Sequence, residues 1–335
     1  MIKLPRPLQK QITARTLAGI ISSLLLSQIA GAHEYEALIK AKKYTEVERA
    51  VATKLATDPN NADALIVRTE LILIEGKENR LDEAAKIAEQ CIAAHPKNSE
   101  CHEALGNVLG SKAMRGGIMS AMGYVGKIRD AFQKSVELDP KNFSARSSLM
   151  QFYLQAPSMF GGGTAKAKEL IVETTAVNHA AGALLQATAD LSDEKFDRAE
   201  ATVLAVNANG VEALASMQRD VLSSLGHAYV NAKRYSDGER IFREFSLRYP
   251  DKAAGFYGMG KALQEQGKNK EAIPHFEKSI LLEASAFAYY RVAKAWQAIS
   301  EKAKAIASFE KALSLKPELS KKTKSDAEDQ LKALR

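Results

Sequence analysis

The sequence predicts an all-α protein, a superhelical α-α solenoid of about eight helical hairpins closed by a C-terminal capping helix. Two observations predict this fold. A pattern of small and apolar residues recurs about every 34 residues, and apolar residues within each copy are spaced three or four apart, as on one face of a helix. The composition permits such an array, because 46% of the 335 residues are apolar and 26% are charged. It excludes a disordered chain, a collagen-like repeat and a disulfide-dense mini-protein.

Residues 1–32 have the composition of an export signal. Four basic residues precede the first acid, an apolar run extends from Leu17 to Ile29, and Ala30-Gly31-Ala32 offers a small-residue cleavage site. The run is shorter than the roughly 20 residues that a membrane-spanning helix needs. We therefore expect cleavage before His33 and a periplasmic or secreted mature protein. An uncleaved signal that anchors the chain to a membrane is the alternative.

The segment 33–317 is expected to form the repeat array, with less regular spacing in its first half. Its upstream copies keep mainly the pattern of the second helix. These traces are Leu38, Tyr44, Val47, Val51 and Pro59; Ala84 to Pro96; Ile128, Phe132, Ser135 and Pro140; Leu149, Tyr153, Ala167 and Ile171; and a degenerate copy with Phe196, Ala199 and Val203. The longer intervals locate two insertions between helices, near residues 111–127 and 156–164.

The three clearest copies span residues 219–250, 253–285 and 286–317. In order they contain Leu225-Gly226, Tyr229, Tyr235, Phe242 and Pro250; then Phe256, Met259-Gly260, Leu263, Ala272 and Phe276; then Tyr289, Val292-Ala293, Trp296, Ala305, Phe309, Ala312 and Pro317. This pattern resembles the tetratricopeptide repeat, whose signature is W-x2-L-G-x2-Y, then A-x3-F, then P. The resemblance implies a stack of antiparallel helix pairs, and the polar stretch 318–335 is then expected to be the capping helix.

Helix packing explains the residue types in these copies. Gly226, Gly260 and Ala293 in the first helices are small enough for two backbones to approach closely. Phe242 and its equivalents in the next two copies fill the space between a hairpin and its neighbour. A hairpin cannot bury its own apolar face, so stability is expected to come from stacking.

Catalytic motifs fail at specific positions. His33-Glu34 and His102-Glu103 both begin H-E-x-x-H, but the fifth residue is Ala37 in one and Gly106 in the other. There is no G-x-S-x-G sequence, and the glycine run 161–163 lacks the lysine of a phosphate-binding loop. We therefore expect no enzymatic activity, no cofactor and no small-molecule substrate.

Nucleic-acid binding is not expected either. Most of the formal charge of +7 belongs to the export segment, which carries four basic residues and no acid. In the remainder Lys and Arg alternate with Asp and Glu, as on a solvated helix surface.

Cys91 and Cys101 lie five residues on either side of Pro96, so they should face each other across adjacent antiparallel helices. Export makes a disulfide between them feasible. The alternative, which the sequence favours, is that both are unbridged packing residues, because Cys91 occupies a position that usually holds a buried alanine.

A copper-handling role is an alternative function. An exported chain that begins with His33 offers an amine and an imidazole, and five of the eight methionines fall between Met114 and Met159. No further histidine or carboxylate pattern completes a site, so we assign no metal ligands.

The two insertions are a first candidate binding surface. They are expected to be neighbouring loops, hinged by glycines, that form an apolar, Met-rich ridge. The ridge residues are Met119, Met122, Tyr124, Met159 and Phe160. They form either a local sub-core, in which the insertions cover each other, or a protein-contact patch.

The concave groove is a second candidate surface. The resemblance implies that particular positions of each first helix line it. Here these include His227, Tyr257, Lys261, Gln264, Tyr290, Lys294 and Gln297. Tyr257 and Lys261 recur one repeat later as Tyr290 and Lys294, a ladder that suits an extended peptide bearing carboxylates. The alternative is a merely solvated inner face. The predicted function is thus a non-catalytic, exported scaffold that binds a protein or an extended peptide in the cell envelope.

Overall fold

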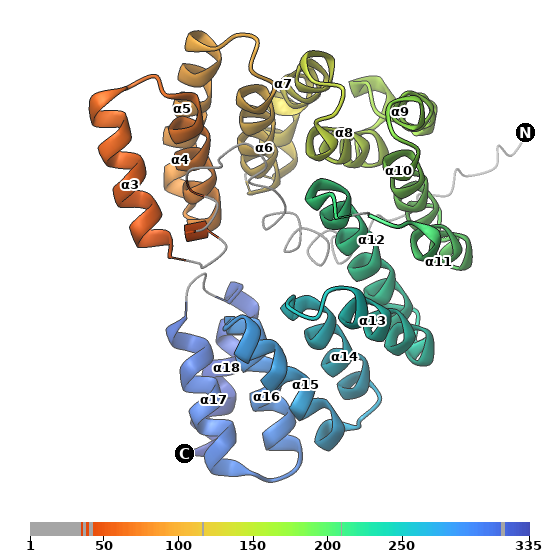
Figure 1. Cartoon of the computed structure of the whole chain (residues 1–335). Coiled ribbons are helices and arrows are strands. Elements are labelled where there is room, and N and C mark those ends of the chain that lie inside the picture. Colours follow the sequence, from red (N-terminus) through yellow and green to blue (C-terminus); the bar gives the residue numbers. More distant parts are fainter. Residues whose placement is uncertain (1–34, 36–37, 40–42, 116, 209, 316–318) are drawn as a thin grey trace, which may run out of the picture.

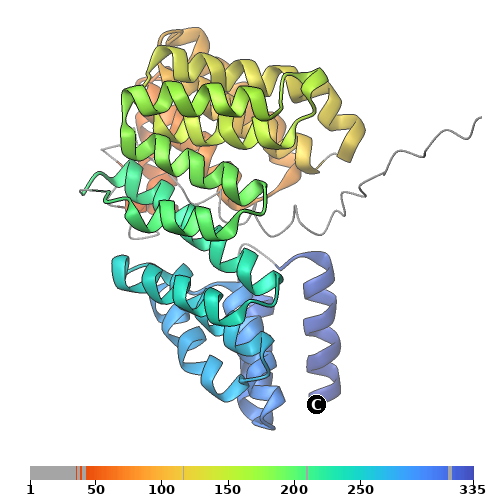
Figure 2. The same cartoon turned by 90° about the vertical axis from the view of Figure 1, so that its right-hand side faces the viewer.

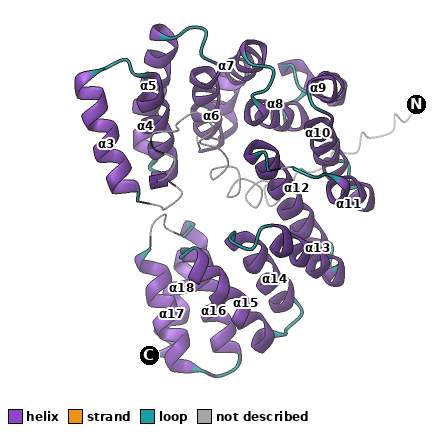
Figure 3. Ribbon diagram, viewed as in Figure 1, coloured by secondary structure: helices purple, strands orange, loops and turns teal. Residues whose placement is uncertain are grey.

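The structure is a computed structural model that describes residues 35, 38–39, 43–115, 117–208, 210–315 and 319–335. These residues form sixteen α-helices and two short 3-10 helices, and none of them lies in a strand (Figure 3). The α-helices are α3 (Tyr44–Thr57), α4 (Ala62–Glu75), α5 (Leu81–Ala94), α6 (Ser99–Arg115), α7 (Gly117–Leu138), α8 (Phe143–Gln155), α9 (Thr164–Val177), α10 (His179–Ser192), α11 (Phe196–Ala205), α12 (Glu212–Asn231), α13 (Tyr235–Arg248), α14 (Ala253–Glu265), α15 (Asn269–Leu282), α16 (Ala286–Ala298), α17 (Lys302–Ser314) and α18 (Lys321–Leu334).

Consecutive helices pack in antiparallel pairs. From α4/α5 to α16/α17 the described residues form seven complete hairpins, with α3 before them and α18 after them. The first helix of each hairpin also contacts the first helix of the next, and these helices line the inner side of an arc (Figure 1). The view turned by 90° shows that the stacked hairpins wind into a superhelix (Figure 2). The predicted solenoid is confirmed.

Local signals start and end these helices. Asn61, Asn142, Asn178 and Ser285 each cap a first helix by accepting a hydrogen bond from a backbone N–H three residues on. The turns inside the last four hairpins each contain one residue in the left-handed region, at Glu194, Lys233, Gly267 and Ser300. The same turn geometry therefore recurs at nearly the repeat period.

The core lies between helices at the positions that the sequence predicts. Phe242 is fully buried, and its ring packs against two first helices, at Gly226 in its own hairpin and Gly258 in the next. A Cβ atom added at Gly226 would lie 2.6 Å from this ring, and one at Gly258 only 2.1 Å. The glycines are therefore required by the close approach of the helices.

The first insertion differs from its prediction. Its residues extend two helices instead of forming a glycine-hinged loop, so that α6 has 17 residues and α7 has 22. The apolar spacing at helical period continues through this segment, which favours helix extension. The second insertion is a short connection that contains a 3-10 turn at Ser158–Phe160.

The predicted export signal, its cleavage site before His33, and Pro317 at the predicted end of the array lie outside the described residues. Within the described part of the chain, none of the helices is both long and apolar enough to span a membrane.

Cys91 at the end of α5 and Cys101 at the start of α6 form a disulfide, with Cα atoms 5.5 Å apart. The interpretation of both as unbridged packing residues is therefore wrong. Both side chains are fully buried, so packing and bridging occur together. The antiparallel turn between the helices brings the two residues within bridging distance.

Removal of this disulfide is expected to lower the free energy of unfolding by about 2–3 kcal/mol, because the bridge closes a loop of 10 residues. Urea denaturation of wild type with and without a reducing agent measures the effect. The Cys91→Ala/Cys101→Ala variant is the control, since its stability should not respond to reductant. Free thiols in protein purified from an oxidising compartment would contradict the prediction.

Candidate functional site

The predicted groove residues lie on three successive first helices, α12, α14 and α16. Two identical sets stand one repeat apart: the α14 triad of Tyr257, Lys261 and Gln264, and the α16 triad of Tyr290, Lys294 and Gln297. Each triad occupies positions four and three residues apart, which place its members on one face of the helix. The side chains of both triads are partly exposed. Their surroundings nevertheless differ.

The α16 triad is engaged by the last helix of the chain. The Tyr290 hydroxyl donates to Asp326 Oδ2 at 2.5 Å, and the Lys294 ammonium lies 3.6 Å from the same oxygen. Gln297 Nε2 donates to Gln330 Oε1 at 2.8 Å. Burial and the contact with Asp326 raise the pKa of Tyr290 to about 12, while the hydrogen bond from Tyr290 lowers the pKa of Asp326.

The α14 triad binds no carboxylate of the described residues. Lys261 forms neither a hydrogen bond nor an ion pair with any described residue, and burial, followed by the charge of Arg291, lowers its pKa. Gln264 Nε2 donates to the Arg291 carbonyl at 3.0 Å, and Arg291 Nη1 donates back to Gln264 Oε1 at 3.1 Å. Arg291 Nη1 also bonds Glu265 Oε1 at 2.9 Å, so the carboxylate nearest to Lys261 in sequence is paired with another cation.

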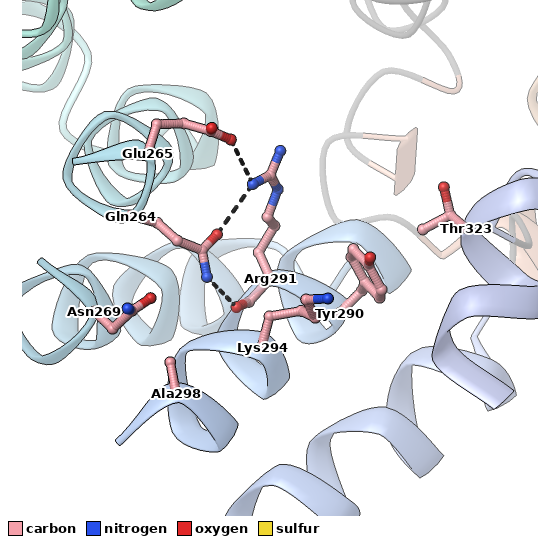
Figure 4. A pocket seen from close by; sticks show the side chains of 8 residues that line it. All are labelled: Gln264, Glu265, Asn269, Tyr290, Arg291, Lys294, Ala298 and Thr323. Carbon is pink, nitrogen blue, oxygen red and sulfur yellow. Dashed lines mark hydrogen bonds and ion pairs between the residues drawn. The ribbon is translucent and has the colours of Figure 1, made fainter. Parts of the chain in front are cut away.

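Side chains of both triads and their neighbours line a pocket of about 460 Å³ between α14, α16 and α18. In Figure 4 the Arg291 guanidinium reaches between Gln264 and Glu265, and Thr323 of α18 faces the pocket from the far side. The pocket is lined by more polar than apolar side chains. It suits a charged or hydrogen-bonding group better than an apolar one.

His227 on α12 continues the site towards the preceding hairpin. Its ring lies 5.0 Å from that of Phe242 and 6.4 Å from that of Tyr257, both in edge-on geometry. Its Nδ1 is buried with no hydrogen-bond partner among the described residues. Burial, together with the charges of Lys261 and Arg291, lowers the pKa of His227 to about 3, so the ring is neutral at pH 7.

A family model described as the tetratricopeptide repeat matches residues 253–285 and 288–319, the two hairpins that carry the triads. These two hairpins are tetratricopeptide repeats. No curated protein matches the chain.

Solved structures that resemble this chain have low sequence identity to it. A tetratricopeptide repeat protein from Parabacteroides merdae is 18% identical, with a TM-score of 0.43, and the match covers 93% of this chain and 99% of that one. The Cut9-Hcn1 assembly of APC/C matches 94% of this chain at 17% identity and a TM-score of 0.41, and this chain spans 58% of that one. The translocator chaperone SycD of Yersinia enterocolitica is 18% identical over 41% of this chain and 91% of its own, with a TM-score of 0.33.

At Met122 and Met159 the insertion ridge is not the sub-core that was one of its two predicted forms. Met122 is 54% exposed and Met159 is 81% exposed, so neither is covered by the other insertion. Tyr124 and Phe160 are partly buried, and the Lys112 ammonium lies 4.8 Å from the centre of the Tyr124 ring. The side chain of Met119 lies outside the described residues. The contact-patch alternative stays a prediction.

Metal binding receives no support from the described part of the chain, where no group of three or more His, Cys, Asp or Glu side chains could hold an ion. His33, on which the copper alternative depends, lies outside that part.

Sequence reasoning missed two residues of the groove, Arg291 and Asp326. Arg291 directly follows Tyr290, and its contact with the α14 triad depends on how neighbouring hairpins are rotated. Asp326 belongs to a helix outside the repeat pattern, so the period carried no signal for its position.

Proposed function

We propose that this tetratricopeptide repeat protein is an exported, non-catalytic scaffold that binds another protein of the cell envelope, as an extended segment, in the groove formed by α12, α14 and α16. Tetratricopeptide arrays are scaffolds for protein and peptide binding. The observation that carries the proposal is the repetition of Tyr, Lys and Gln on α14 and α16, with the Lys261 ammonium unpaired among the described residues. Export rests on the charge pattern of residues 1–32.

The test begins with expression of the full chain from its own N-terminus in a Gram-negative host. Fractionation and N-terminal sequencing should find the protein in the periplasm, starting at His33. Crosslinking in the native envelope then identifies attached proteins by mass spectrometry. Cytoplasmic recovery with residues 1–32 intact would overturn the envelope assignment.

Lys261→Glu is expected to weaken binding of a crosslinked partner at least 10-fold, because a charge-assisted contact is worth about 1.5–3 kcal/mol. Titration calorimetry of the purified pair measures the change. Lys168→Glu on α9, an outer helix, is the matched control because Lys168 is exposed and distant in sequence from the groove. Lys294 is not used, since its substitution would also disturb Asp326. Equal affinity of both variants would remove the groove from the proposal.

A further inference from the structure

The chain's own C-terminal helix shows what one of the two triads binds. On α16, Tyr290 and Lys294 converge on a single carboxylate oxygen, Asp326 Oδ2, and Gln297 holds Gln330 one turn further along α18. This arrangement is a hydroxyl and an ammonium directed at one anion. Charge-assisted hydrogen bonds of this kind are among the stronger polar contacts in proteins.

The α14 triad has the same three residues, and the helix caps identify the matching positions on the next helix. Ser285 caps α16 and Ser320 caps α18, each by accepting a hydrogen bond from the backbone N–H three residues on. Arg291 and Asp326 both lie six residues after the cap and therefore occupy equivalent places. The α14 triad thus meets a cation, through hydrogen bonds of Tyr257 and Gln264 with Arg291, where the α16 triad meets a carboxylate.

The described residues leave positive charge at the α14 triad without a paired carboxylate. Lys261 has no ion-pair partner among the described residues, and Glu265 is paired with Arg291. Burial, and after it the positive charge of Arg291, lowers the pKa of Lys261, so both act against its charged form. An anion placed between Tyr257 and Lys261 would relieve this repulsion and make the contacts that Asp326 makes one repeat later.

We infer that a partner's Asp or Glu side chain binds the α14 triad at Tyr257 and Lys261, and that Asp326 is a built-in occupant of the equivalent place on the α16 triad. The inference rests on the proposed function. It specifies an extended peptide with one acidic residue at the α14 triad, next to Arg291. The second triad is closed to the partner by α18.

Peptide selection on the mature chain (33–335) tests both halves of this inference. Random 12-residue peptides are displayed and selected on wild type, Lys261→Gln and Asp326→Asn. Matched controls are Lys168→Gln and Asp329→Asn, which alter exposed residues elsewhere on α9 and α18. Thermal unfolding of every variant verifies that it is folded.

Wild type and both controls should select peptides with one enriched acidic position. Lys261→Gln should lose that enrichment and bind the wild-type peptides at least 10-fold more weakly. Asp326→Asn should select a second acid about three residues from the first, because neighbouring helices lie about 10 Å apart and an extended residue spans about 3.3 Å.

The outcomes that would contradict this inference differ from the outcome that would contradict the proposed function on which it rests. Selected peptides without an acidic position, or an acidic position that persists in Lys261→Gln, overturn the α14 site and leave a peptide-binding groove. A single acidic position in Asp326→Asn overturns the role of Asp326. Failure of all five proteins to enrich any peptide overturns the proposed function and this inference with it.

Discussion

Replacement of Phe242 by alanine is expected to lower the free energy of unfolding by about 3–5 kcal/mol. The Phe242 ring is fully buried and touches both its own hairpin, at Gly226, and the next one, at Gly258. Its loss leaves a cavity at the junction between α12/α13 and α14/α15. Because a solenoid is held together by contacts between neighbouring repeats, the change should also reduce cooperativity, seen as a smaller m-value in urea denaturation.

A pair of glycine substitutions tests whether close packing around Phe242 accounts for the stability of this junction. Gly258→Ala should destabilise the protein by about 1–3 kcal/mol, since the added Cβ would overlap the Phe242 ring. Gly110→Ala on α6 is the control, because a Cβ there meets nothing within 4 Å, and the better helix propensity of alanine should stabilise by about 0.5–1 kcal/mol. Similar gains in the free energy of unfolding for both variants would contradict this account of the junction.

Asp220→Asn is expected to stabilise the protein above neutral pH. Asp220 lies on α12, and burial raises its pKa to about 7, with only Arg219 opposing the shift. In the unfolded chain the pKa is near 3.8. Between these values the folded state holds a proton that the unfolded state has released, so the stability of wild type falls as pH rises from about 4 to about 7.

The difference between the two proteins should therefore depend on pH. The amide introduced by the substitution does not titrate, so the variant and wild type should differ least near pH 4 and most above pH 7. The largest expected difference in the free energy of unfolding is about 4 kcal/mol, because each unit of pKa shift corresponds to about 1.4 kcal/mol. Urea denaturation at pH 4, 6 and 8 measures the difference, with the exposed Asp329→Asn as the control. A stability difference that is the same at all three pH values would show that Asp220 ionises normally.

Periodicity accounts for the parts of the fold that sequence reasoning predicts. Gly226 is expected at a close approach of helices and Phe242 at the junction between hairpins, because both positions recur in the next repeat, and the structure confirms both. A loop is expected for the first insertion because it breaks the period. Extra helical turns break the period in the same way, so spacing alone could not distinguish a longer hairpin from a longer loop.

The groove, too, could be predicted from the sequence only in part. The ladder of Tyr257, Lys261, Tyr290 and Lys294 could be predicted from the repeat, because equivalent positions of stacked helices share one face. The contacts that each triad makes could not be predicted in this way. The same three residues bind a carboxylate on α16 and, among the described residues, none on α14, since one triad faces Asp326 and the other faces Arg291.

The sequence by itself determined the helical hairpins, their order and the small and aromatic residues at their junctions, because helix pairing between neighbours is a local property with a fixed period. Only the tertiary structure decided that Cys91 and Cys101 are bridged, that the first insertion is helical and that α18 brings Asp326 to the groove. Each of these depends on the distance and rotation between packed helices. Packing sets those quantities through side chains that are far apart in the chain, so no repeat period encodes them.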